Sequence, residues 1–282
     1  MKTFLKHSYL ILLLVSCLIV VPTALILQSC DSEPTDDPIS TTTTVTSTTA
    51  VATTTVSTTA TTTTTQPTTT TSRTPAGTNT TVSFPDANDK VSFADTLFIG
   101  DSRTVGLRDY GKISDATFFC AVSLSSNNVR TKAIEVKGYG DITLGNLLGK
   151  KNFTTVYIML GINEIGGSLT SIANKYQLII DLVHEKQPNA TVVVQSTLHV
   201  TSARNQQELA KKGYFNNPRI NDLNAELAKL ANGTSIRYLD MNPMYDDENK
   251  CLMAEAAASD GIHIKAKYYL LWRDYLDKHR IS

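Results

Sequence analysis

Three residues in the C-terminal two thirds of the chain have the side chains of a serine nucleophile and its base. Ser102 directly follows an apolar segment, and Asp260 and His263 lie together in the sequence Asp260-Gly261-Ile262-His263. A spacing of three residues across a turn lets a carboxylate accept a hydrogen bond from one ring nitrogen of the histidine, which leaves the other nitrogen free to take a proton. A serine hydroxyl is a poor nucleophile until a base removes its proton. We therefore expect Ser102 as nucleophile, His263 as base and Asp260 as the orienting carboxylate.

Acyl chemistry at a serine also needs hydrogen-bond donors for the negative charge that develops on the carbonyl oxygen. Ser102 is predicted to open a helix, so its own N–H would point outward; a serine at that place can alternatively be a simple helix N-cap. Asn163 follows Gly161 at the end of another apolar segment, where its amide can donate into the same space. A backbone N–H from residues 121–125 would complete the set.

These residues need a scaffold that brings the ends of separate segments to one edge. Short segments rich in Val, Ile, Phe and Tyr predict strands over residues 96–99, 117–122, 155–160, 190–195 and 235–239. Apolar stripes at helical spacing predict helices over 172–183, 220–230 and 268–275. Alternating strands and helices predict a parallel, doubly wound sheet with helices on both faces, which binds its ligands at the carboxyl ends of the strands.

The blocks Gly100-Asp101-Ser102, Gly161-x-Asn163 and Asp260-x-x-His263, in this order and on these elements, resemble the SGNH or GDSL-type serine hydrolases. The resemblance runs from about residue 96 to the C-terminal helix. It implies an α/β fold, the flavodoxin-like three-layer α/β/α sandwich with a central parallel sheet. It also implies an esterase or acyl-transfer activity that needs no metal and no cofactor. The sequence has no G-x-S-x-G motif, which argues against the α/β-hydrolase fold.

The resemblance also assigns the third oxyanion donor. Within residues 121–125, Ser123 stands where the family usually has glycine. A backbone N–H keeps its role after this replacement if the backbone dihedrals permit a side chain. The resemblance thus implies an oxyanion hole formed by Ser102, Ser123 and Asn163.

Two further positions depart from the family pattern, and a third lies on the same sheet edge. Arg103 stands where leucine is common, and Glu164 stands where aspartate is common. We expect both in the substrate pocket, where Arg103 would favour an anionic or hydroxyl-rich ligand. His199, after the fourth predicted strand, is another pocket candidate and a competing base. Residues 138–140, Gly-Tyr-Gly, fail the spacing of a dinucleotide-binding motif and predict a turn.

The N terminus has the pattern of an export signal. Lys2 and Lys6 precede an apolar run over residues 9–27, and residues 27–30, Leu-Gln-Ser-Cys, resemble a bacterial lipobox. The lipobox implies that Cys30 is lipidated; the alternative is an uncleaved signal anchor, because the run is near the lower limit for a membrane span. Both alternatives place residues 31–282 outside the cytoplasm. We expect an extracellular, cell-surface protein that is anchored to the membrane by its N terminus.

The following segment has the composition of a stalk. Residues 41–81 contain 25 threonines, one charged residue and no aromatic residue, which is too little apolar area to bury a core. The predicted organisation is therefore a signal peptide with a lipobox-like end over 1–30, a disordered Thr-rich linker over 31–90 and an SGNH hydrolase domain over 91–282. The chain has 26 basic and 26 acidic residues, so its balance is not that of a polybasic nucleic-acid-binding protein.

The predicted domain contains two cysteines, Cys120 and Cys251. An exported protein can oxidise such a pair to a disulfide. Cys120 lies in an apolar segment that predicts a buried thiol on a strand, so both states stay open. Neither a Cys-x-x-Cys motif nor a histidine cluster accompanies the two cysteines, so we expect no metal site.

Together these patterns predict an exported serine esterase that removes small acyl groups, such as acetyl, from a carbohydrate or cell-wall polymer. The substrate follows from the predicted location and the analogy of fold. An O-acyltransferase acting on a sugar hydroxyl is an alternative with the same residues. A surface binding module that retains the three residues without catalysis is an alternative of another class.

Overall fold

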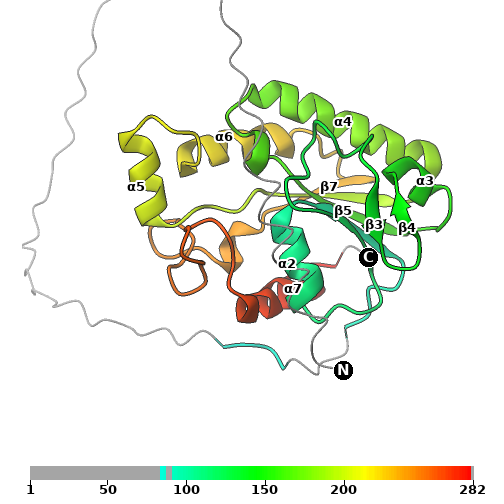
Figure 1. Ribbon diagram of the computed structural model, residues 1–282, viewed down its shortest axis with the longest axis horizontal. Coiled ribbons are helices and arrows are strands. Elements are labelled where there is room, and N and C mark those ends of the chain that lie inside the picture. The colour runs from blue at the N-terminus through cyan, green and yellow to red at the C-terminus, as the bar shows by residue number, and fades with distance from the viewer. Residues whose placement is uncertain (1–82, 87–90, 281–282) are drawn as a thin grey trace, which may run out of the picture. The chain divides into compact units, whose positions relative to one another are not determined.

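A parallel sheet forms the centre of the protein, for which a computed structural model describes residues 83–86 and 91–280 (Figure 1). Its strands are β1 (Thr96–Gly100), β2 (Thr117–Cys120), β5 (Thr155–Met159), β6 (Thr191–Gln195) and β7 (Ile236–Leu239). They lie in the order β2-β1-β5-β6-β7, and every neighbouring pair is parallel. The residues of β1, β5 and β6 are buried almost throughout, as expected of strands that are covered on both faces.

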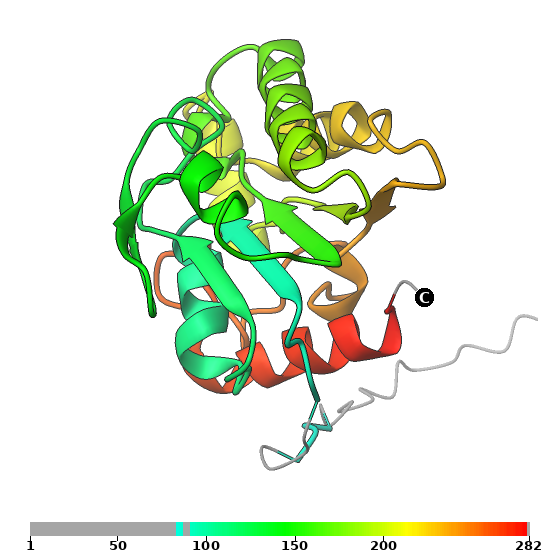
Figure 2. The same ribbon diagram turned by 90° about the vertical axis from the view of Figure 1, so that its right-hand side faces the viewer.

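Helices cover both faces of the sheet, as Figures 1 and 2 show. One face packs against α3 (Leu144–Leu148), α4 (Leu169–Lys186) and α6 (Asn217–Ala228), and the other against α2 (Ser102–Tyr110) and α7 (Tyr269–Lys278). Because side chains alternate along a strand, Leu97 of β1 belongs to the core with Tyr176, whereas Phe98 belongs to the core with Trp272. The predicted three-layer α/β/α sandwich is confirmed.

Several smaller elements were not apparent in the sequence. They are the antiparallel hairpin of β3 (Ile134–Val136) and β4 (Gly140–Ile142), helix α3, helix α5 (Ser202–Ala210), and the 3₁₀ turns η1 (Ile162–Glu164), η2 (Asn242–Met244) and η3 (Ala266–Tyr268). The predicted turn at residues 138–140 is confirmed, since the N–H of Tyr139 donates to the carbonyl of Val136 at 2.8 Å. Its flanking strands have only three residues each, too few for a clear alternation of apolar and polar residues.

The carboxyl ends of β1 and β2 determine where the residues of the site lie. Strand β2 ends at Cys120, two residues before its predicted end, because the chain turns into a loop in which Ser123 has a φ of +63°. Strand β1 passes into α2 through a single residue, Asp101. A Cβ atom on Gly100 would lie 1.9 Å from Oγ1 of Thr104, so only glycine fits this tight turn. The turn places Ser102 directly at the edge of the sheet.

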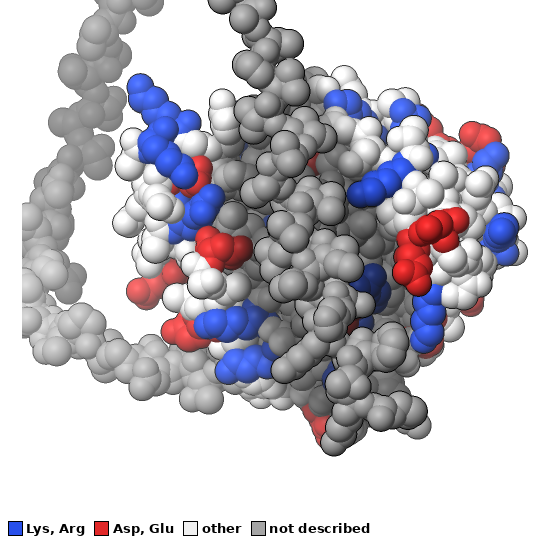
Figure 3. All heavy atoms as spheres, viewed as in Figure 1, with Lys and Arg blue, Asp and Glu red and all other residues white. Residues whose placement is uncertain are grey.

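The predicted signal peptide, including Cys30, lies outside the described residues, and so does the predicted linker apart from residues 83–86. These assignments stay predictions. Within the described ranges, no helix is both long and apolar enough to cross a membrane. On the described part of the face in Figure 3, basic and acidic side chains are intermingled, in keeping with the balanced charge of the chain.

Candidate active site

Ser102 and His263 meet at the carboxyl edge of the sheet. Ser102 is the first residue of α2, and the Asp101 side chain caps this helix by accepting a hydrogen bond from the N–H of Arg103 at 2.9 Å. Ser102 is therefore not the N-cap, the alternative that its position left open. Its Oγ lies 2.8 Å from Nε2 of His263, although the two residues are 161 positions apart.

His263 is held in turn by Asp260. Nδ1 of His263 lies 2.5 Å from Oδ2 of Asp260. The other carboxylate oxygen accepts from the backbone N–H groups of Ile262 and His263 at 2.9 and 3.0 Å. Since Nδ1 donates to a carboxylate, Nε2 is the nitrogen that can accept the Ser102 hydroxyl proton. The arrangement can thus activate Ser102 as a nucleophile.

Hydrogen bonds keep Asp260 ionised to low pH. Burial alone would raise the pKa of Asp260, but the hydrogen bonds from the His263 ring and from the two backbone N–H groups outweigh it and lower the pKa to about 2. The folded-state pKa thus lies below the ordinary value of 3.8. The carboxylate therefore stabilises the fold above about pH 4, and this contribution is lost as the pH falls through about 2.

We accordingly expect the stability difference between the wild type and Asp260→Asn to shrink by about 1 kcal/mol between about pH 5 and about pH 2. The full shift would correspond to a larger value, but Asp260 is 41% exposed and solvent screens its interactions. Urea denaturation of both proteins at the two pH values measures the difference. A difference that does not change with pH would contradict the hydrogen-bonded carboxylate.

Three hydrogen-bond donors lie at the same edge, after β1, β2 and β5. As the first residue of α2, Ser102 has a backbone N–H without an intrahelical acceptor. Asn163 is an exposed residue of η1, and its Nδ2 donates one hydrogen bond to the carbonyl of Leu124 at 2.9 Å. An amide nitrogen carries two hydrogens, so the second remains available to a ligand. Ser123 precedes Leu124 in the same loop, so the bond from Asn163 links the second donor segment to the third.

Asn128 fixes the backbone around Ser123 and was not recognised in the sequence. Its Oδ1 accepts from the N–H of Ser125 at 2.9 Å, and its Nδ2 lies 3.5 Å from the Ser123 carbonyl. Asn and Asp side chains commonly bind the backbone of a nearby turn in this way, but the local sequence offered several equivalent polar residues. Ser123 has a left-handed backbone, a conformation that favours glycine over residues with a side chain.

Replacing Ser123 with glycine should stabilise the protein by about 0.5–1 kcal/mol, because a left-handed backbone disfavours a residue with a Cβ atom. The role assigned to Ser123 uses only its backbone N–H, so the rate of ester hydrolysis should change by no more than about twofold, well below the cost of losing an oxyanion donor. Urea denaturation and kcat/KM measure the two effects. A large loss of activity with unchanged stability would show that the Ser123 hydroxyl itself takes part.

The expectation that Arg103 lines the substrate pocket is wrong. Arg103 is fully buried on the inner face of α2. Its Nη2 lies 3.5 Å from Oδ2 of Asp101, and its Nη1 donates to the carbonyl of Leu198 at 3.3 Å. The reason is the phase of the helix: Arg103, Thr104 and Leu107 occupy the face that packs inward. Arg103 therefore connects the start of α2 to the segment that follows β6.

Glu164 also points into the protein rather than into a pocket. Its Oε1 accepts from the N–H of Ser126 at 2.6 Å, and its Oε2 is buried. Burial raises the pKa of Glu164, an effect that the hydrogen bonds from Ser126 only partly offset. The carboxylate ties η1 to the loop that contains Ser123, so the pocket role expected for Glu164 is wrong.

The predicted roles of His199 as a pocket residue and as a competing base are wrong. It is 6% exposed, and both ring nitrogens are engaged: Nδ1 lies 2.8 Å from Oδ1 of Asp246, and Nε2 lies 2.7 Å from Oδ1 of Asn221. Burial alone would lower the pKa of His199, but the hydrogen bonds to Asp246 and Asn221 outweigh it and raise the pKa. A buried ring that donates from both nitrogens cannot serve as a base for Ser102.

The two cysteines of the described residues are unpaired and buried. Cys120 ends β2 as a buried thiol, and burial raises its pKa to about 12. Of the two states left open by the sequence, the structure shows the free thiols. The described residues contain no group of three or more His, Cys, Asp or Glu side chains placed to hold a metal ion.

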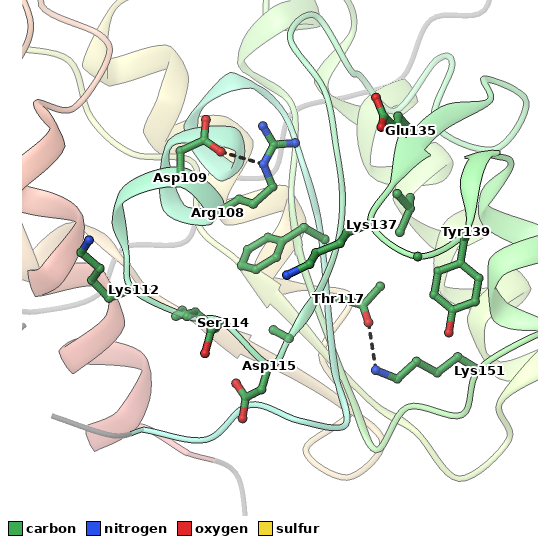
Figure 4. Close-up of a pocket in the computed structure, with 15 residues that line it drawn as sticks. Arg108, Asp109, Lys112, Ser114, Asp115, Thr117, Glu135, Lys137, Tyr139 and Lys151 are labelled. Atoms are coloured by element: carbon green, nitrogen blue, oxygen red, sulfur yellow. Dashed lines mark hydrogen bonds and ion pairs between the residues drawn. The ribbon is translucent and has the colours of Figure 1, made fainter. Parts of the chain in front are cut away.

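A hollow of about 1220 Å³ lies along the edge strand β2, and none of the Ser102, His263 and Asp260 side chains lines it. Figure 4 shows Lys137 extending into it from the hairpin side, across from Lys112. Lys151 donates to the hydroxyl of Thr117 at 3.0 Å. The residues that line the hollow include no histidine, so it has no counterpart of the Ser102–His263–Asp260 arrangement. The candidate active site is therefore the edge that carries Ser102.

The sequence matches the GDSL-like lipase/acylhydrolase family over residues 98–271. No curated protein matches it. Three solved structures that are similar to it come from two bacteria. The first is a Streptococcus pneumoniae protein named after platelet activating factor, with 19% identity, a TM-score of 0.50, and coverage of 68% of this chain and 86% of that one.

The second is a GDSL-like lipase from Bacteroides thetaiotaomicron, with 16% identity, a TM-score of 0.48, and coverage of 65% of this chain and 85% of that one. The third is the C-terminal catalytic domain of a peptidoglycan O-acetyltransferase from Streptococcus pneumoniae, with 18% identity, a TM-score of 0.43, and coverage of 65% and 90%. At these identities the similarity extends to the fold alone.

Proposed function

The chain belongs to the GDSL-like lipase/acylhydrolase family and is a serine ester hydrolase, and we propose that Ser102, His263 and Asp260 are its catalytic triad. The contact of 2.8 Å between Ser102 Oγ and His263 Nε2 is the observation that carries this proposal. The contact between Nδ1 of the same ring and Asp260 fixes the tautomer that the reaction needs.

The geometry supports a two-step reaction. In the first step, Ser102 Oγ forms a bond to the ester carbonyl carbon while its proton passes to Nε2 of His263. The resulting tetrahedral intermediate collapses with cleavage of the bond to the alcohol, which receives that proton from His263, and the acyl group stays on Ser102. In the second step, water attacks the acyl group and gives its proton to His263, which returns it to Ser102 as the acid leaves.

The oxyanion of each tetrahedral intermediate would be stabilised by three donors. These are the backbone N–H groups of Ser102 and Ser123 and the second hydrogen on Nδ2 of Asn163. The bond from Asn163 to Leu124 and the bond from Ser126 to Glu164 hold two of the donor segments together. Donors that are held before the reaction need no reorganisation when charge develops, which is the main advantage of such a site.

The proposed substrate is a carbohydrate or cell-wall polymer that carries small acyl groups such as acetyl. The openness of the site supports it: the side chains of His263 and Asp260 are 43% and 41% exposed, so a polymer chain can lie across the edge of the sheet. The predicted lipidation at Cys30 and the predicted Thr-rich linker support a location at the outer surface of the membrane. Mass spectrometry of membrane-extracted protein tests the anchor, because an intact Met1 terminus would contradict lipidation at Cys30.

Product analysis tests the proposed function. The full-length protein is incubated with p-nitrophenyl acetate and with an acetylated oligosaccharide, each with and without an unacetylated oligosaccharide as acceptor. Release of free acetate from both substrates supports the esterase. Transfer of acetyl to the acceptor, with little release into water, would instead identify an O-acyltransferase. Absence of both reactions would contradict the proposal and would favour the alternative function, a surface binding module.

A further inference from the structure

An exposed aromatic ring stands beside the oxyanion-hole segment. Tyr214 lies in the loop between α5 and α6 and is 54% exposed. Its ring packs on the backbone of Gly166, where a Cβ atom would come within 2.9 Å of Cδ2 of the ring. Gly166 follows Asn163 by three residues, and the N–H of Gly167 donates to the carbonyl of Glu164 at 2.8 Å. At the rise of a 3₁₀ turn, about 2 Å per residue, Gly166 lies about 6 Å from Asn163 along the chain.

Arg219 of α6 holds the Tyr214 ring against the segment around Gly166. Its guanidinium carbon lies 5.5 Å from the centre of the Tyr214 ring. The same guanidinium donates from Nε to the carbonyl of Ile165 at 2.6 Å and from Nη2 to the carbonyl of Gly167 at 2.5 Å. One side chain thus positions both the ring and the backbone beneath it. These contacts hold Tyr214 against residues 165–167, the segment that directly follows η1 and Asn163.

The loop that carries Tyr214 is anchored by a buried carboxylate. Glu208 of α5 is 2% exposed, and its Oε1 forms ion pairs with Arg204 at 2.8 Å and with Lys211 at 2.9 Å. Its Oε2 accepts from the N–H of Phe215 at 3.4 Å. A loop held at both ends in this way presents Tyr214 in one orientation. An aromatic ring held in one orientation loses little conformational entropy when a ligand packs on it.

The same part of the chain also adjoins the His263 side of the site. The N–H of Thr201, the N-cap of α5, donates to the carbonyl of Gly261 at 2.9 Å. Helix α5 and its following loop therefore run from the Asp260–His263 turn to the Asn163 turn. Tyr214 lies in the loop after α5, at the end of this stretch that adjoins the Asn163 turn.

We propose that Tyr214 forms a carbohydrate subsite, on which a sugar ring of the acylated polymer stacks while its ester lies at Ser102. This inference rests on the proposed esterase function. A pyranose ring has faces that consist of C–H groups, and these pack on the electron-rich face of an aromatic ring through dispersion and electrostatic attraction. A rigid, exposed tyrosine beside an open catalytic edge matches that chemistry, whereas a free acyl chain would require an apolar channel.

Kinetics with two substrates test the subsite. Tyr214→Ala should lower kcat/KM for an acetylated oligosaccharide about tenfold, mainly through KM, a factor that corresponds to about 1.4 kcal/mol. Hydrolysis of p-nitrophenyl acetate, which has no sugar ring, should stay at the wild-type rate. Tyr214→Phe should behave as the wild type on both substrates, because stacking needs the ring and not the hydroxyl.

Tyr110→Ala provides the matched control. Tyr110 is 50% exposed and ends α2, about 12 Å along the helix from Ser102, so its removal should affect neither substrate. An equal loss on both substrates in Tyr214→Ala would show a structural role and overturn the subsite. So would an unchanged kcat/KM for the oligosaccharide, or a loss confined to p-nitrophenyl esters of long-chain acids.

A binding measurement separates this inference from the proposed function. If the wild type hydrolyses neither substrate, the esterase proposal fails, and calorimetric titration with the unacetylated oligosaccharide still tests the ring. Weaker binding by Tyr214→Ala than by Tyr110→Ala would support the subsite without catalysis. Equal binding by the two variants would overturn it.

Discussion

Replacing Ser102 with alanine should lower kcat for p-nitrophenyl acetate by at least about 10³-fold, the scale on which loss of a nucleophile acts in a serine triad. Ser102 Oγ is the atom that contacts Nε2 of His263, and alanine leaves the imidazole with no hydroxyl to deprotonate. The fold should be retained, because the Asp101 side chain and not Ser102 caps α2. Steady-state kinetics together with circular dichroism measure both effects.

Ser114→Ala is the control for this change. Ser114 is an exposed serine that lines the hollow beside β2 and not the proposed site, so its removal should leave kcat unchanged. Activity of Ser102→Ala equal to that of Ser114→Ala would rule out a serine nucleophile at position 102.

Replacing Asp260 with asparagine should lower kcat by about 10³-fold, somewhat less than the loss known for a buried triad carboxylate. An asparagine oxygen can still accept from the N–H groups of Ile262 and His263, which the Asp260 carboxylate binds in the wild type. Its NH₂ group would then face Nδ1 of His263 and favour the tautomer with the proton on Nε2. That nitrogen could no longer accept the proton of Ser102.

The matched control uses another His–Asp pair of the described residues, His199 and Asp246. Asp246→Asn removes the partner of Nδ1 of the buried His199 and should reduce stability while leaving kcat of the folded protein unchanged. If Asp260→Asn and Asp246→Asn lose activity in parallel with stability, Asp260 has a structural role only. Denaturation curves measured beside the kinetics distinguish the two results.

The arrangement of strands and helices was predictable from sequence because each layer leaves a periodic pattern. Strands β1, β5 and β6 are almost wholly apolar, and Ile172, Tyr176 and Val183 recur on one face of α4. The hairpin β3–β4 was missed because its strands are short. Helix α5 was missed because only Glu208 among its residues is buried, so no apolar stripe marks it.

The edge that carries the site was also predictable, but the direction of its side chains was not. Ser102 and Asn163 follow the ends of β1 and β5, and the Asp260–His263 turn, which follows no strand directly, reaches the same edge. Arg103 and His199 lie at the same edge, yet the Arg103 side chain packs inward from α2, and the His199 ring is held by Asp246 and Asn221. Whether such a polar side chain faces the ligand or the interior depends on partners distant in sequence. Tyr214 went unnoticed for the same reason, since its neighbour Gly166 comes from another loop.

The most direct test of the central claim is the site of acylation. The full-length protein is mixed with p-nitrophenyl acetate, quenched in acid during turnover, digested and analysed by mass spectrometry. We predict one acetyl group on the peptide that contains Ser102 and none on the same peptide from Ser102→Ala. An acetyl group carried by another residue during turnover, or undiminished turnover by Ser102→Ala, would contradict the account.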